Sequence, residues 1–88
     1  MKREVEEFLH DSYKILEIMY CRRIPLADGS FKSELSRDTL SELSGFTVWQ
    51  VKRLINRLVK LEYLERIERK RGQYIITKKT ISAVKILK

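Results

Sequence analysis

The chain is poor in the residues that build metal centres and disulfide scaffolds, because it has one cysteine, one histidine and one proline. Cys21 has no second cysteine to pair with inside the chain, and it cannot form a metal cluster with His10 alone. We therefore expect no metal and no internal disulfide, so that Cys21 is either a free thiol or an intersubunit disulfide. The sequence also lacks glycine-rich phosphate loops, nucleophile motifs and metal-ligand spacings. We expect neither an enzyme, nor a cofactor, nor a small-molecule ligand.

Long apolar runs are missing as well, since none approaches the roughly 18 residues that a membrane span needs. The first residues, MKREVEEFLHD, lack the apolar segment and the cleavage site of a signal peptide. These absences predict an intracellular protein that does not enter a membrane. A hydrophobic fraction of 43% with a charged fraction of 35% indicates a folded, soluble chain. Its 88 residues suffice for one domain, residues 1–88.

Positive charge is concentrated in one segment of the chain. Residues 47–79 contain ten Lys or Arg and three Asp or Glu, so this segment carries the whole net charge of +7. The remainder contains nine residues of each sign. Such an asymmetry favours a polyanion as the partner, and a merely soluble basic face is the alternative explanation.

Helical spacing of apolar residues predicts a long first helix over residues 4–22. Its apolar arc spans roughly 220°, whereas about 100° is enough to cover one small core. The excess predicts a second apolar surface, covered by the C-terminal helix or by another subunit. We assign a homodimer interface to residues of these two helices. They are Tyr13, Ile15, Ile18, Ile81, Val84 and Leu87.

The middle of the chain has the pattern of two helices separated by a sharp turn. Ser36 can cap a short helix over residues 36–45, and Gly45 supplies the left-handed residue that ends it. Thr47 can cap the next helix, residues 48–61. Because so few residues separate the two helices, we expect them to cross sharply, as in a helix-turn-helix. Leucines of the shorter helix face the core, namely Leu40 and Leu43. The apolar stripe of the longer helix consists of Val51, Leu54, Ile55, Leu58 and Leu61.

Alternating β-branched and aromatic residues then predict a β-hairpin over residues 63–77, with a basic tip, RKRG, at 69–72. Basic residues also protect exposed strand edges from aggregation, so the tip has that alternative explanation. A short strand is expected at 31–35. The apolar spacing of residues 80–88 predicts a short amphipathic helix with Thr80 as its cap.

The order of these elements resembles the winged helix-turn-helix superfamily, in particular small archaeal and bacterial regulators of the MarR-like group. The resemblance covers residues 36–77, through L-x-x-L-x-G-F-T at 40–47, V-x-x-L-I-x-x-L at 51–58 and R-G-Q-Y-I-I-T at 71–77. It implies an α+β, mainly α fold with a three-helix core, a two- or three-stranded β wing and a short C-terminal helix. Such proteins often have glycine where the third helix turns into the wing. This chain has Glu62, and because a left-handed Glu is strained, we expect the helix to run further.

The resemblance implies a sequence-specific protein that binds double-stranded DNA and regulates transcription, in the cytoplasm and on the nucleoid. The third helix would lie in the major groove and the wing on the minor groove or the backbone. Glutamine pairs with adenine and arginine with guanine, so Gln50 and Arg53 are candidate base contacts. Phosphates or a narrowed minor groove are the expected contacts of Arg57, of Lys60 and of the hairpin tip at 69–71. The candidate DNA-binding residues are Thr47, Val48, Trp49, Gln50, Lys52, Arg53, Asn56, Arg57, Lys60, Arg69, Lys70 and Arg71.

Trp49, the only tryptophan, lies on the charged side of the third helix, opposite the apolar stripe. Its ring has three interpretations: it contacts a thymine methyl, it donates the indole N–H to a phosphate, or it folds over the turn onto the protein. An alternative function is a protein–protein adaptor, with Trp49 as the anchor of the interface. A third is binding of RNA or of a replication origin through the same basic face.

Overall fold

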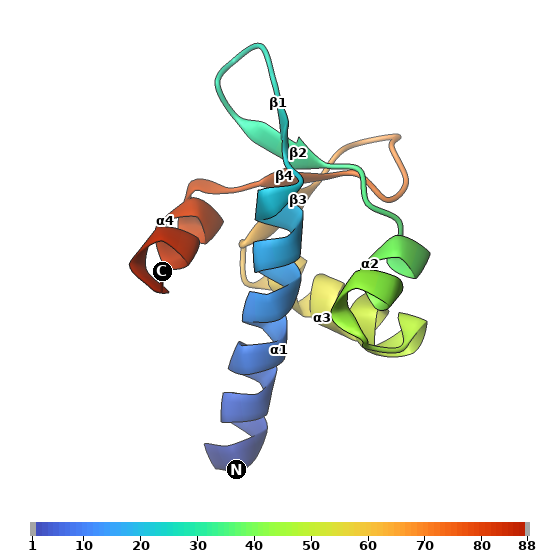
Figure 1. Cartoon of the computed structure of the whole chain (residues 1–88). Helices are drawn as coiled ribbons and strands as arrows, with labels where there is room; N and C mark the ends of the chain where they lie inside the picture. The colour runs from blue at the N-terminus through green and yellow to red at the C-terminus, as the bar shows by residue number, and fades with distance from the viewer. Residues whose placement is uncertain (1, 88) are drawn as a thin grey trace.

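The computed structural model describes the backbone of residues 2–87 and the side chains of residues 10–84. Over this range it is a small α+β fold, mostly helical, with four helices and one four-stranded antiparallel sheet (Figure 1). The predicted class, α+β and mainly α, is therefore confirmed. The helices are α1 (Lys2–Cys21), α2 (Arg37–Ser44), α3 (Val48–Lys60) and α4 (Lys78–Leu87). The strands are β1 (Ile24–Pro25), β2 (Phe31–Ser33), β3 (Leu64–Arg66) and β4 (Tyr74–Ile76).

The sheet has the strand order β1-β2-β4-β3, and every neighbouring pair is antiparallel. Strand β2 confirms the strand expected at 31–35, and its Ser33 lies opposite Tyr74 of β4. Strand β1 has no counterpart in the sequence prediction. The sheet therefore has four strands, whereas we expected two or three. The sequence did not predict β1 because this strand has only two residues. One of them is Pro25, which a sheet accepts only at an edge such as this one.

A tight turn connects β1 to β2 and projects from the body of the molecule (Figure 1). Asp28 Oδ1 accepts hydrogen bonds from Ser30 Oγ at 2.6 Å and from Ser30 N at 3.0 Å. The hydroxyl bond first, and then the amide bond, lower the pKa of Asp28 below its ordinary value of 3.8. Gly29 has a φ of 89°, a conformation that glycine adopts without strain.

Helix α1 contacts α2, α3 and α4, and its buried face forms the centre of the core. Two residues assigned to the homodimer interface belong instead to the interior, because Ile15 and Val84 are both 0% exposed within the single chain. Ile15 lies between Ser12 and Met19 at helical spacing, on the face that packs against the other helices. The sequence pattern assigned Ile15 to the excess part of the wide apolar arc, but the other helices of the same chain cover this part. Leu87, assigned to the same interface, has a side chain outside the described residues.

The caps of α2 and α3 are those predicted. Ser36 Oγ accepts from Thr39 N at 3.1 Å, and Gly45 ends α2 with a φ of 82°. Leu40 is fully buried as expected, but Leu43 is 40% exposed, because the buried line of this short helix runs through Leu40 and Ser44 and Leu43 lies at its edge. The expected stripe of α3 is buried up to Leu58.

The end of α3 corrects two expectations. The helix stops at Lys60, and Glu62 has a φ of 67°, so the left-handed glutamate that we expected the chain to avoid is present. Leu61 is consequently 44% exposed and leaves the buried stripe. Thr80 does not cap α4, which begins at Lys78, but is buried and donates its hydroxyl to Tyr63 O.

The left-handed turn after α3 is compensated by donors from the start of α4. A helix leaves its last carbonyls without partners inside the helix. Lys79 Nζ donates to Leu61 O at 3.0 Å, and Thr77 Oγ1 lies 2.8 Å from Glu62 O. These hydrogen bonds fix α4 against the end of α3 and offset the strain at Glu62.

Candidate nucleic-acid interface

The outward face of α3 is basic and exposed. Val51, Leu54 and Leu58 turn inward, and all charged side chains of the helix are on the opposite side. The exposed polar residues are Lys52, Arg53, Asn56, Arg57 and Lys60. The helical spacing therefore predicted correctly which side of α3 is available to a partner.

Trp49 is 64% exposed on this face, the largest exposure of any large hydrophobic residue among those described. The ring does not fold back onto the protein, so the third interpretation of Trp49 is wrong. The guanidinium of Arg53 instead lies over the ring, with Cζ 4.9 Å from its centroid. This cation–π contact covers part of the indole and restricts the arginine to one side of the helix.

Gln50 has a structural role at the start of α3. Its Oε1 accepts a hydrogen bond from Thr47 N at 2.9 Å, and its own N–H donates to Thr47 Oγ1 at 3.1 Å. These reciprocal bonds form a capping box. A bidentate contact with adenine requires the same amide oxygen, so the cap competes with the predicted base contact of Gln50.

A hydrogen bond joins α3 to the hairpin of β3 and β4. Arg66 Nη2 donates to Asn56 Oδ1 at 2.8 Å, and the Arg66 guanidinium lies 5.9 Å from the centre of the Tyr74 ring. Arg66 was absent from the predicted site, although the sequence has a signal for it. Residues two apart in a strand share a face, so Arg66 lies on the same side of the sheet as the buried Leu64 and therefore faces the helices.

The hairpin tip is exposed and basic, as predicted, at Arg69, Lys70 and Arg71. Arg69 has a φ of 64° and Gly72 a φ of 72°, so two left-handed residues shape the tip where the sequence indicated only the glycine. The connection between β3 and β4 projects on the side of the molecule where α2 lies (Figure 1).

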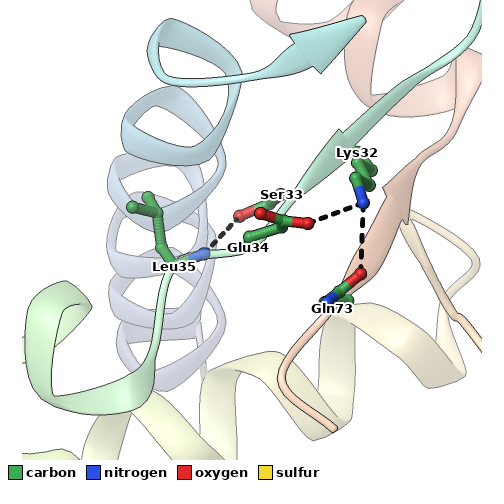
Figure 2. A network of polar contacts seen from close by, with 5 residues as sticks. All are labelled: Lys32, Ser33, Glu34, Leu35 and Gln73. Atoms are coloured by element: carbon green, nitrogen blue, oxygen red, sulfur yellow. Dashed lines mark hydrogen bonds and ion pairs between the residues drawn. The ribbon is translucent and has the colours of Figure 1, made fainter. Parts of the chain in front are cut away.

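The residue that joins the hairpin tip to β4 is held by strand β2. Figure 2 shows Lys32 between two acceptors, with Nζ 3.2 Å from Gln73 Oε1 and 2.6 Å from Glu34 Oε1. Ser33 Oγ accepts from Leu35 N at 3.4 Å and fixes the chain where it leaves β2 for α2. Gln73, which leads into β4, is therefore tied to the strand next to it.

Arg57 and Lys60 lie in the last turn of α3, where cations interact favourably with the helix dipole. Their charge therefore stabilises the helix whether or not DNA is bound, and it is weaker support for an interface than the charge of Arg53. Thr47 and Val48 are exposed at the beginning of the helix, Val48 by 41%. The structure thus places nine of the twelve predicted residues on α3 or at its cap, and all nine are exposed.

The predicted dimer surface retains three residues that are partly exposed: Tyr13, Ile18 and Ile81. The hydroxyl of Tyr13 donates to Glu17 Oε2 at 3.1 Å. Desolvation first, and then this hydrogen bond, raise the pKa of Tyr13 above its ordinary value of 10.0. Ile18 and Ile81 pack against the edge of the core. Cys21 is a free, exposed thiol.

Within the described residues, no helix combines the length and apolarity required to cross a bilayer. In the same part of the chain, histidine, cysteine and carboxylate side chains form no group of three that would suit a metal ion. Comparison of the chain with family models, with curated proteins and with solved structures found no match.

Proposed function

We propose that this protein is a winged-helix transcription regulator that binds double-stranded DNA. Helix α3 lies in the major groove, and the β3–β4 hairpin reaches the minor groove or the backbone. The observation that carries the proposal is that exposed cations lie on two elements that are in direct contact. The exposed cations of α3 are joined to the basic hairpin through the hydrogen bond between Asn56 and Arg66.

The dimensions of α3 suit this function. Its 13 residues make a helix about 20 Å long, and a major groove about 12 Å wide admits such a helix. The first two turns present Trp49 and Arg53 as one stacked pair, with Lys52 beside them. Stacking on the indole restricts the conformations of the Arg53 side chain, so less entropy is lost when its guanidinium pairs with a guanine.

A selection of duplexes from a random pool tests this proposal and yields a cognate site. Fluorescence anisotropy then compares Arg53→Ala with Arg22→Ala, which removes an exposed arginine next to the end of α1. We expect Arg53→Ala to cost about 1–3 kcal/mol at the cognate site and to relax preference at one base pair. Equal, small effects of the two substitutions would contradict base reading by α3.

A protein–protein adaptor is the second candidate function, and exposed apolar side chains favour it. Leu43, Val48 and Trp49 are 40%, 41% and 64% exposed, around the turn between α2 and α3. Binding dominated by apolar burial changes little with salt, whereas duplex binding through phosphates is strongly salt-dependent. An affinity for a protein partner that stays constant between 50 and 200 mM salt would favour the adaptor.

We also propose that the protein is a homodimer, formed through α1 and α4. Tyr13, Ile18 and Ile81 support this, because they leave apolar surface partly uncovered on adjoining helices. A two-fold dimer would place two α3 helices on half-sites about one DNA turn apart. Sedimentation of a monomer at micromolar concentration would exclude the dimer and leave DNA binding by the single chain untouched.

A further inference from the structure

A basic hollow lies between the first turn of α2 and the inner side of the β3–β4 hairpin. Its volume is about 640 Å³, within the range of about 300–1,000 Å³ of pockets that hold small ligands. It is partly open to solvent. Cations from two separate parts of the chain line it. They are Arg37, Arg66, Arg69, Lys70 and Arg71.

The charged side chains that line the basic hollow are all positive. In the described part of the chain, no acidic side chain is among those that line it. Five cations around one concavity repel one another, and a concavity with low-dielectric walls strengthens their field. Arg37 is also the first residue of α2, where the helix dipole disfavours a positive charge. An anion in the hollow would relieve both costs.

Several walls of the basic hollow are fixed before any ligand arrives. Asn56 accepts from Arg66 Nη2 at 2.8 Å and holds that guanidinium on the inner side of the hairpin. Lys32 Nζ holds the amide of Gln73, another lining residue, at 3.2 Å (Figure 2). Preorganised donors bind more tightly, because less side-chain entropy is lost on binding. Arg37, Arg69 and Arg71 are exposed and complete the hollow from its rim.

We propose that the basic hollow binds a phosphate group. Guanidinium groups from α2 and from the hairpin would hold its oxygens in forked hydrogen bonds, the geometry in which arginine matches phosphate. The phosphate belongs either to the DNA backbone or to a free polyphosphate such as a nucleoside triphosphate. A free polyphosphate would be a ligand beyond the proposed function. A DNA phosphate would rest on that function, because the hairpin already contacts the DNA in it, and would add Arg37 of α2 to the contact.

The test is a titration of the protein with inorganic tripolyphosphate at constant ionic strength, followed by amide chemical shifts. We expect saturable shifts at Arg37 and at residues 66–74. Arg37→Gln should weaken binding about tenfold or more, the cost of a charged hydrogen bond, and Arg22→Gln should leave it unchanged. Both arginines are exposed, and retained amide dispersion shows that the variants fold. Shifts spread evenly over all basic residues, or equal losses in the two variants, would overturn the proposal.

A second arm identifies the source of the phosphate. If a DNA phosphate occupies the hollow, Arg37→Gln lowers the salt slope of duplex binding by about one. If tripolyphosphate binds but that slope is unchanged, the ligand is a free polyphosphate. The tripolyphosphate titration contains no DNA, so it succeeds or fails independently of the proposed function. Arg53→Ala tests α3 in turn without altering the hollow.

Discussion

The capping box at the start of α3 gives a prediction that separates stability from recognition. Thr47 Oγ1 accepts from Gln50 N, and Gln50 Oε1 accepts from Thr47 N. Loss of an N-cap side chain typically costs about 1 kcal/mol, which lowers the melting temperature of a domain this size by about 4–8 °C. We therefore expect a shift of this size for Thr47→Ala. Gln50→Ala removes one exposed hydrogen bond and should cost about half as much, or about 2–4 °C.

Gln50→Glu is the matched control. A glutamate at this position completes a capping box and interacts favourably with the helix N-terminus, so its melting temperature should equal or exceed that of the wild type. It cannot donate to adenine N7 as an amide does. Thermal melts followed by circular dichroism measure stability, and anisotropy on the cognate duplex and its single-base variants measures preference. If Gln50→Ala melted like the wild type while losing preference at one adenine, the capping role of Gln50 would be refuted.

Three further predictions follow from the packing and the turns. Leu40→Ala should lower the free energy of unfolding in urea by about 2–5 kcal/mol. Leu43→Ala, at a 40% exposed site, should lower it by less than about 0.5 kcal/mol. Equal losses in the two variants would contradict the orientation of α2. Trp49→Leu should leave the melting temperature nearly unchanged and weaken duplex binding by about two- to fivefold, because Arg53 loses its stacking partner; unaltered anisotropy would show that the stack does not contribute. The lowered pKa of Asp28 stabilises the fold above pH 3.8, and that contribution is lost as pH falls through the folded-state value. In urea titrations the stability difference between wild type and Asp28→Asn should therefore be present at pH 6 and shrink as pH falls below 3.8. A difference that does not change with pH would mean that the carboxylate charge is not its cause.

The elements that the sequence predicted well are those with local determinants. Ser36, Thr47 and Gly45 are cap residues whose chemistry acts within one turn, and all three lie where that chemistry places them. The basic face of α3 followed from periodicity alone, because a helix with one apolar stripe must expose its other side. The register of Trp49 likewise predicted which side of α3 it lies on, although the sequence left open whether its ring folds onto the protein.

The features that the sequence did not reveal depend on contacts between distant segments. Strand β1 exists because β2 lies beside it, and Thr80 is buried where α4 packs on the end of α3 and its hydroxyl donates to Tyr63 O. The left-handed Glu62 contradicts local preference, since hydrogen bonds from residues 77–80 outweigh its strain. Arg37 and the hairpin line the same hollow only because the tertiary fold brings them together, and the sequence has no signature of this.

The salt dependence of duplex binding tests the central proposal most directly. If six or more cations of α3 and the hairpin meet phosphates, the affinity for the selected duplex should fall by roughly 10³-fold or more between 50 and 200 mM salt. The slope should decrease by about one when Arg71 is replaced by alanine. An affinity that changes less than about threefold over this range, or no binding to any duplex at 50 mM salt, would contradict a DNA-binding function for this surface.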